Sequence, residues 1–224
     1  PATLVDLKRI AELNDISVDG ARLRVGAGAT HDEIARHPMV RTHAPLLAAV
    51  EERVGNARVR AQGTLGGNVC FAEPRSDVIA LLIAVDARLV LRSPAGERDV
   101  PAADFVLGPY WTDRAPDELL VRAEIALPCA SGTYLKLQLA ERPTVGVAAV
   151  RTAAARPCRV VVGAAIETPQ VFEYDTWDAV DAAEIAAGLE PVSDLAGSAA
   201  YKRHVTEVYV RRAVAQTVGH ERDE

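Results

Sequence analysis

The sequence has little of what a disulfide scaffold or a membrane span requires. Its 224 residues include only three cysteines, Cys70, Cys129 and Cys158, an odd number at wide spacing. They form neither a disulfide framework nor a CxxC metal motif, so we expect reduced or buried thiols. The longest uninterrupted apolar run, Val78 to Val85, is far shorter than the roughly 20 residues that cross a bilayer, which predicts no membrane span.

A surplus of positive charge is also absent. Lys and Arg number 25 against 31 Asp and Glu, a net charge of −6, which argues against a general nucleic-acid or anionic-membrane surface. The first residues, Pro1 to Asp6, lack the basic start and apolar stretch of a secretory signal, so we expect a cytoplasmic protein. With 49% hydrophobic residues and a mean hydropathy of +0.05, the chain has the composition of a folded globular protein.

Motifs for a metal site or a catalytic triad are missing as well. Three histidines, His31, His37 and His43, recur every six residues, but Pro38 interrupts any single helix that could bring them together. We therefore predict surface positions for them and no metal site. No Gly-x-Ser-x-Gly elbow or pair of carboxylates stands out, so no catalytic residue is assigned.

Periodicity and turn residues predict helices and strands of alternating type. In the first half we expect strands at 22–25, 88–91 and 117–127, and helices at 30–37, 45–52 and 76–86. In the second half we expect strands at 134–139, 146–151 and 159–166 in one sheet, covered by helices at 176–187 and 198–217. Val54 to Ala72, with four glycines, has the composition of a loop, and Pro128 to Gly132 is the predicted domain boundary.

The chemistry of the sequence is concentrated between Gly63 and Asp77, which read Gly-Thr-Leu-Gly-Gly-Asn-Val-Cys-Phe-Ala-Glu-Pro-Arg-Ser-Asp. The paired glycines let a ligand approach the backbone, and free N–H groups there can form an anion site that suits a pyrophosphate. Thr64 and Asn68 can bond phosphate or ribose oxygens, and Asp77 can cap a helix or accept bonds from ligand hydroxyls. A Gly-Gly turn without a ligand is the alternative, and the stretch is neither a Gly-x-Gly-x-x-Gly fingerprint nor a Walker loop.

Thr-Leu-Gly-Gly-Asn followed by Ala-Glu-Pro-x-Ser-Asp closely resembles the second flavin-binding motif of the molybdenum hydroxylases. This is the flavin subunit or domain of the xanthine dehydrogenase and carbon monoxide dehydrogenase family. Further segments resemble the family in the same order along the chain: Val25 to Thr30, Asp117 to Leu120, Val145 to Ala149 and Tyr201 to His204. Several separated matches in order are more specific than one glycine motif.

The resemblance implies an α+β fold, a two-lobed FAD-binding domain followed by a small sheet-and-helix C-terminal domain. The FAD-binding domain corresponds to residues 1–128 and the C-terminal domain to residues 133–224. Family members carry a first flavin motif, an Ala-Gly-Gly-Thr or similar turn, before the point where this chain begins, and nothing in residues 1–50 replaces it. The N-terminal lobe is then incomplete because the sequence is a fragment, which we favour, or this member has lost half of its site.

The resemblance also assigns cofactor contacts. The residues implied along the FAD phosphates are Thr64, Leu65, Gly66, Gly67 and Asn68. The other implied contacts are the acidic ligand Asp77, the apolar residue Val54 near the flavin, and the later residues Leu120 and Lys136. For Lys136 a solvated charge at a strand edge is the alternative. Glu141 to Thr144 stands where the family has Arg-x-x-Asp, near the flavin ring.

The implied function is an oxidoreductase subunit: an FAD-binding electron-transfer subunit of a molybdenum-containing hydroxylase or dehydrogenase. It would take electrons from the 2Fe–2S clusters of a partner and pass them to an external acceptor. The implied partners are a large molybdenum-cofactor subunit and a small 2Fe–2S subunit, in a dimer of heterotrimers, because this chain lacks the thiolates that hold a cluster. The alternatives are a flavin-free scaffold that only assembles the complex and a stand-alone nucleotide-binding oxidoreductase.

Overall fold

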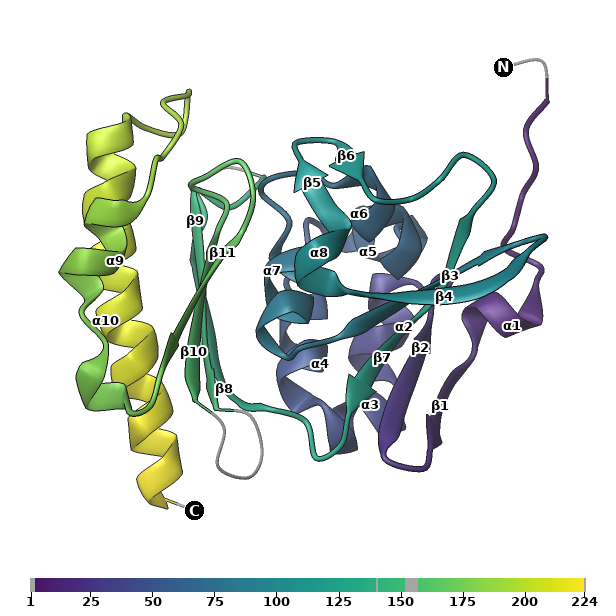
Figure 1. The fold of residues 1–224 in the computed structure, drawn as a ribbon, viewed down its shortest axis with the longest axis horizontal. Helices are drawn as coiled ribbons and strands as arrows, with labels where there is room; N and C mark the ends of the chain where they lie inside the picture. Colours follow the sequence, from purple (N-terminus) through teal and green to yellow (C-terminus); the bar gives the residue numbers. More distant parts are fainter. Residues whose placement is uncertain (1–2, 140, 152–156, 224) are drawn as a thin grey trace.

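Two antiparallel sheets with helices between them form the molecule (Figure 1), and the computed structural model describes residues 3–139, 141–151 and 157–223. The five-stranded sheet has the order β1 (Ile16–Asp19), β2 (Arg22–Gly26), β7 (Leu119–Ala126), β3 (Arg88–Ser93), β4 (Gly96–Pro101). The four-stranded sheet has the order β11 (Gln170–Tyr174), β10 (Cys158–Gly163), β9 (Val145–Arg151), β8 (Ser131–Leu137). A small hairpin joins β5 (Val106–Gly108) to β6 (Trp111–Thr112). The all-antiparallel pairing confirms the predicted α+β class.

The helices divide into those that come before the second sheet in the chain and those that come after it (Figure 1). The set before the second sheet is α1 (Ala11–Asn14), α2 (His31–Arg36), α3 (Pro38–His43), α4 (Pro45–Glu51), α5 (Ala57–Gln62), α6 (Leu65–Phe71), α7 (Asp77–Ala84) and α8 (Ala102–Phe105). A 3-10 turn (Trp177–Ala179), α9 (Ala182–Gly188) and α10 (Ala199–Asp223) follow it. Helices α4 and α7 lie between the sheets, while α9 and α10 cover the far face of the second sheet.

Helix α7 is the centre of the fold. Ser76 caps it by accepting a hydrogen bond from the Ile79 N–H at 3.2 Å, and all of its residues are buried. A helix that is apolar on every side must be covered on every side, which explains its contacts with β9, β10 and α4. The apolar run that began at Val78 is therefore a core helix. None of the helices in the described part of the chain combines the length and apolar character needed to span a bilayer.

The two central strands of the four-stranded sheet, β9 and β10, are buried on both faces. Along β9, Val145, Val147 and Ala149 point into the core under α9 and α10, whereas Ala148 and Val150 point into the core shared with α7. Successive side chains on a strand point to opposite faces, so burial of both faces requires an unbroken apolar strand. This accounts for the run of valine and alanine that predicted these strands.

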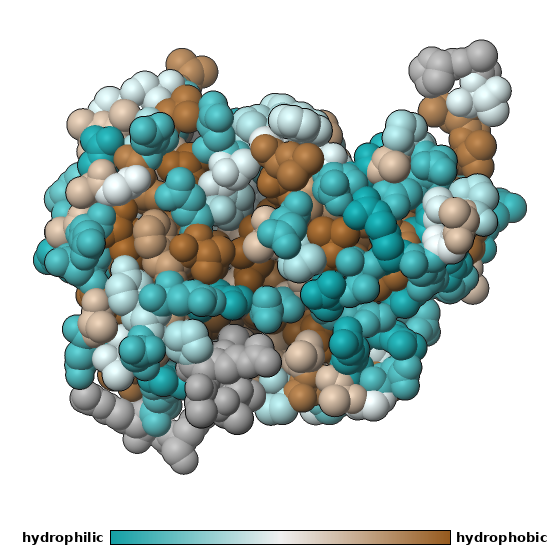
Figure 2. All heavy atoms as spheres, viewed as in Figure 1, coloured by the Kyte–Doolittle hydropathy of each residue, from teal (hydrophilic) through white to brown (hydrophobic). Residues whose placement is uncertain are grey.

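The five-stranded sheet, by contrast, keeps one face polar. Leu23 and Val25 of β2 point into the core, while Arg24 alternates with them and pairs with Glu124 on the neighbouring strand at 3.3 Å. Arg122 extends the row by pairing with Glu124 at 2.8 Å and with Glu97 at 3.0 Å. Hydrophilic residues accordingly gather over β3, β4 and β7 in Figure 2.

The predicted loop from Val54 to Ala72 is wrong, because two short helices occupy it. Asn56 caps α5 by accepting hydrogen bonds from the Arg58 and Val59 N–H groups at 3.0 and 3.1 Å. Thr64 caps α6 through the Gly67 N–H at 3.1 Å. Side-chain caps and tertiary contacts supply what the glycine-rich sequence lacks in helix propensity.

The two parts of the chain share a core. Tyr134, Ala148 and Val161 of the second sheet belong to the same buried cluster as α7 and the five-stranded sheet. A second cluster lies between the four-stranded sheet and helices α9 and α10. The division into residues 1–128 and 133–224 remains a prediction.

Candidate functional site

The glycine motif forms the first turn of α6, and its two glycines have different surroundings. Gly66 is buried, and a Cβ there would lie 2.7 Å from the Cβ and 2.9 Å from the carbonyl oxygen of Ala27. Gly67 is exposed, and a Cβ there would meet only the Thr64 hydroxyl, at 3.1 Å. Gly66 is required for close packing of the α6 backbone against the backbone of Ala27. Gly67 leaves a bare surface, that is, an exposed stretch of backbone that no side chain covers.

The backbone N–H groups of this turn are bonded within the protein. The Leu65 N–H donates to the Ala29 carbonyl at 3.0 Å and the Gly66 N–H to the Ala27 carbonyl at 2.7 Å. The Gly67 N–H donates to the Thr64 hydroxyl oxygen. The free N–H groups that the sequence suggested are therefore used by the fold, and the exposed polar group of the turn is the Thr64 hydroxyl, which can still donate its own proton.

Asp77 and Lys136, both predicted from the sequence, meet as a buried pair. The Lys136 ammonium lies 2.7 Å from Asp77 Oδ2, and their side chains are 4% and 5% exposed. The other oxygen, Asp77 Oδ1, accepts a hydrogen bond from the Tyr134 hydroxyl at 2.7 Å, and Lys136 also donates to the Arg53 carbonyl at 2.7 Å. Burial, together with the Asp77 charge, holds the pKa of Tyr134 above its ordinary value, so Tyr134 acts as a hydrogen-bond donor.

This pair corrects two expectations. Asp77 does not cap α7, because Ser76 does so and Asp77 is the first helical residue. Lys136 is not a solvated charge, because its side chain is only 4% exposed and its ammonium is bonded to Asp77 and to the Arg53 carbonyl. Gly146 explains how the cluster fits: a Cβ there would lie 2.3 Å from the Tyr134 hydroxyl oxygen.

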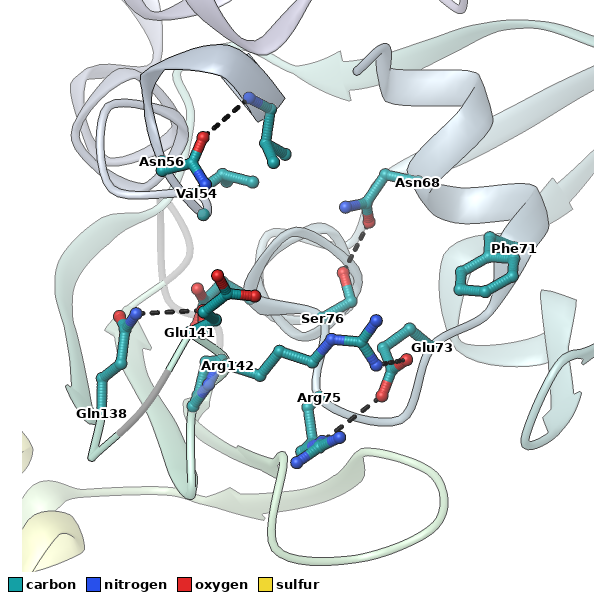
Figure 3. Close-up of a pocket in the computed structure, with 14 residues that line it drawn as sticks. Val54, Asn56, Asn68, Phe71, Glu73, Arg75, Ser76, Gln138, Glu141 and Arg142 are labelled. Carbon is teal, nitrogen blue, oxygen red and sulfur yellow. Dashed lines mark hydrogen bonds and ion pairs between the residues drawn. The ribbon is translucent and has the colours of Figure 1, made fainter. Parts of the chain in front are cut away.

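A cavity of about 430 Å³ opens over the Asp77 carboxylate. Val54 and Asn68, two further predicted residues, line it, together with the arginines Arg75 and Arg142 (Figure 3). Asn68 Oδ1 accepts a hydrogen bond from the Ser76 hydroxyl at 2.6 Å, and its amide nitrogen faces the cavity without a bond to any described residue. Amide, carboxylate and guanidinium groups thus converge on one hollow.

Glu73 closes one side of this cavity. One oxygen of its carboxylate accepts a hydrogen bond from the Tyr110 hydroxyl at 2.9 Å and pairs with Arg142, and the other lies 3.4 Å from Arg75 Nε (Figure 3). Arg142 reaches Glu73 from the segment between β8 and β9. The cavity wall is therefore built from both parts of the chain.

The structure brings some predicted residues together and leaves others apart. Val54, Asn68 and Asp77 line the cavity, and Lys136 is bonded to Asp77 behind it. The α6 turn, from Thr64 to Gly67, lies outside the cavity lining. Leu120 is buried in the main core on β7 opposite Leu91, so the cavity gives it no role.

The sequence analysis missed Tyr134, Glu73 and Arg142. Glu73 and Arg75 lie inside the Ala-Glu-Pro-x-Ser-Asp motif, which is the signal that could have identified them. The surface position predicted for His31 is wrong, because its side chain is buried and bonded to Glu51. Among residues 3–139, 141–151 and 157–223 no group of three metal-ligating side chains is found.

The three cysteines are free thiols at three different places. Cys158 is buried in β10, and Cys70 and Cys129 are half-buried. Burial raises the pKa of Cys129 to about 11, which keeps its thiol protonated.

An antiparallel α+β fold with a cavity lined by the second flavin motif defines a flavin-binding type of protein. Residues 1–129 match the family described as FAD binding domain in molybdopterin dehydrogenase. The chain belongs to this family, its cofactor is FAD, and it is an oxidoreductase subunit of the molybdenum hydroxylase type.

Relatives are found over nearly the whole chain. The carbon monoxide dehydrogenase medium chain of Hydrogenophaga pseudoflava is 33% identical over 96% of this chain and 81% of its own length. The glyceraldehyde dehydrogenase medium chain of Sulfolobus acidocaldarius is 27% identical over 95% of this chain and 82% of its own. The solved quinoline 2-oxidoreductase from Pseudomonas putida 86 superposes with a TM-score of 0.88 at 30% identity, covering 98% of this chain and 83% of that chain. These names describe proteins to which this chain is similar.

Proposed function

We propose that this chain holds FAD against the α6 turn and the cavity over Asp77, and that it transfers electrons within a molybdenum hydroxylase complex. The observation that carries the proposal is the convergence of Asn68 and Asp77, both from the flavin motif, on one cavity with Arg75 and Arg142. FAD has a charged pyrophosphate, ribitol and ribose hydroxyls, and a ring. A hollow that offers positive, acceptor and amide groups fits such a molecule.

The residues proposed to hold the cofactor act in distinct ways. The bare surface of Gly67 and the Thr64 hydroxyl receive the phosphates, and the Asn68 amide nitrogen donates to an oxygen of the cofactor. Asp77 accepts from a hydroxyl, since each carboxylate oxygen retains a free lone pair beside its present partner. Val54, 8% exposed, supplies an apolar wall. Leu65 and Gly66 act indirectly, because both are buried and hold the turn in place.

When bound, the flavin supplies the redox chemistry, while the protein positions it and excludes water from part of its surface. We propose that electrons arrive from the 2Fe–2S clusters of a small subunit and leave to an external acceptor. A large molybdenum-cofactor subunit completes the complex, which we propose to be a dimer of heterotrimers in the cytoplasm. The medium-chain names of the relatives support a multi-subunit assembly.

The domain division is part of the same proposal. Residues 1–128 carry the FAD-binding unit and residues 133–224 a sheet-and-helix unit, joined by the Pro128 to Gly132 segment. The separate core under α9 and α10 supports this division. The shared core around α7 supports a contribution of the second unit to the FAD site, through Lys136 and Arg142.

Titration of the full chain with FAD tests the proposal. We expect flavin fluorescence to be quenched on binding, and Asp77→Asn to weaken binding by about tenfold, the effect of losing one charged hydrogen bond. Arg36→Gln, an exposed change on α2, is the control. A chain that binds no FAD, alone or in its complex, would favour the scaffold alternative.

A further inference from the structure

A buried His–Glu pair lies beneath the site and belongs to none of the contacts described for it. His31 Nδ1 lies 2.5 Å from Glu51 Oε2, and the two side chains are 2% and 0% exposed. The second oxygen, Glu51 Oε1, is buried and makes no hydrogen bond in the described part of the chain. Leaving a buried oxygen without a partner costs free energy, so the pair needs a reason beyond packing.

One end of the pair touches the glycine turn. The backbone N–H of His31 donates to the Gly63 carbonyl at 3.1 Å, and Thr30 and Thr64 form an antiparallel bridge beside it. The His31 ring packs directly on Gly63, where a Cβ would lie only 3.0 Å from His31 Cδ2. The ring therefore defines the position of the residue that precedes Thr64.

The other end supports the cavity wall. Glu51 is the last residue of α4, and Arg53 and Val54 follow shortly after it in the chain. The Arg53 carbonyl accepts a hydrogen bond from the Lys136 ammonium, and Val54 lines the cavity. Burial raises the pKa of Glu51, and the negative charge of Asp77 adds to this rise, while the contact with His31 opposes it. The pair is thus a direct side-chain link between the residue packed on Gly63 and the end of α4, which leads into Arg53 and Val54.

We propose that His31 and Glu51 are a positioning pair, whose hydrogen bond holds the Gly63–Thr64 turn in register with the Arg53–Val54 wall and thereby sets the affinity for FAD. The inference rests on the proposed function, because it assumes that FAD contacts both the turn and the wall. Neither residue contacts the cofactor. A ligand that spans two elements binds more tightly when their separation is fixed beforehand.

The test compares variants of the full chain that remove the His31–Glu51 hydrogen bond with a variant that keeps it. Glu51→Met removes the bond at similar volume, and Glu51→Gln keeps the size and one hydrogen bond to His31. The double variant His31→Leu, Glu51→Met replaces both partners by apolar groups, a change that buried pairs often tolerate without loss of stability. Glu52→Met, at the exposed neighbouring position, is the matched control. The FAD dissociation constant and the urea midpoint without FAD are measured for each.

We expect the double variant to keep its urea midpoint and to bind FAD about tenfold more weakly than the parent, the loss associated with one hydrogen bond to a charged group. Glu51→Gln restores affinity to within about threefold of the parent, and Glu52→Met leaves it unchanged. A folded double variant with parental affinity overturns the inference, and so does Glu51→Gln binding as weakly as Glu51→Met. A parent chain that binds no FAD counts instead against the proposed function.

Discussion

The two ends of the flavin motif, the α6 turn and Asp77, differ in how their polar groups are bonded. At the α6 turn the protein satisfies its own backbone: the Gly66 N–H is bonded to Ala27, and the Gly67 N–H to Thr64. At the Asp77 end it buries a charge pair at the base of a cavity and leaves free lone pairs beside it. One end offers a fixed surface to a ligand, and the other offers polar groups.

The difference shows that adjacent motif residues can have different roles. Gly66 is needed by the fold, since any side chain would enter the Ala27 backbone, whereas Gly67 has room for a side chain as far as the fold is concerned. Asp77 is needed by the fold, because Tyr134 and Lys136 converge on it. Its contact with FAD is the proposed second role. Mutations can separate these roles by comparing stability with FAD affinity.

The largest effect is expected for Lys136→Met. It leaves the Asp77 carboxylate buried with the Tyr134 hydroxyl as its remaining side-chain donor, and breaking one partner from a buried ion pair costs about 3–5 kcal/mol. Urea unfolding measures the loss. The double variant Asp77→Asn, Lys136→Met removes the stranded charge and should recover much of the stability. A single variant as stable as the parent would mean that the pair is solvated in solution.

A smaller loss is expected for Gly66→Ala. Its methyl group would lie 2.7 Å from the Ala27 Cβ and 2.9 Å from the Ala27 carbonyl oxygen, so two backbone segments must move apart. Overpacking of this kind costs about 1–3 kcal/mol. Gly188→Ala is the matched control, because Gly188 is also helical and has open space around its Cα. Equal stability of the two variants would show that the Ala27 contact is loose.

Much of the fold could be predicted because strong local signals coincide with burial. A capping box at Thr30 and Glu33 starts α2, and Pro45 starts α4, close to where both helices were predicted. The valine-rich strands form one sheet because both of its faces are covered. The loop prediction for Val54 to Ala72 was wrong because its high glycine content favours a loop, whereas the segment forms two helices that Asn56 and Thr64 cap.

The site was less predictable, since its contacts join distant residues. The motif and the resemblance predicted Asp77 and Lys136 one by one, but nothing local indicates that Lys136 lies 2.7 Å from Asp77. Tyr134 and Glu51 are missed for the same reason: their partners are 57 and 20 positions away along the chain. The contacts between residues of β8 and α7 form only when the chain folds, so no local sequence pattern predicts them.

Gly67→Val is expected to separate binding from folding. Its side chain meets the Thr64 hydroxyl and is otherwise exposed, so stability should change by less than about 1 kcal/mol, the range of helix-propensity differences. FAD affinity should fall by at least about tenfold, because the branched side chain covers the bare surface proposed for the phosphates. Flavin content after purification and a fluorescence titration measure it. Equal flavin content in variant and parent would contradict the proposal that the FAD phosphates lie against this turn.

The smallest effect is a change in pH dependence at Glu51. Its pKa is raised by burial, so the folded chain holds this proton at pH values where the unfolded chain, with an ordinary glutamate pKa near 4.5, has released it. The proton linkage therefore stabilises the protein below that range, and the stabilisation is lost as pH rises towards the folded pKa. Glu51→Gln cannot titrate, so its free energy of unfolding should rise relative to that of the parent as the pH increases above the ordinary glutamate pKa. The relevant measurement is the difference between the pH–stability curves of Glu51→Gln and the parent, because all other ionisable groups are common to both proteins. Glu52→Gln, exposed on the same turn, should run parallel to the parent. If the curve of Glu51→Gln also runs parallel to that of the parent, burial does not raise the pKa of Glu51 in the folded protein.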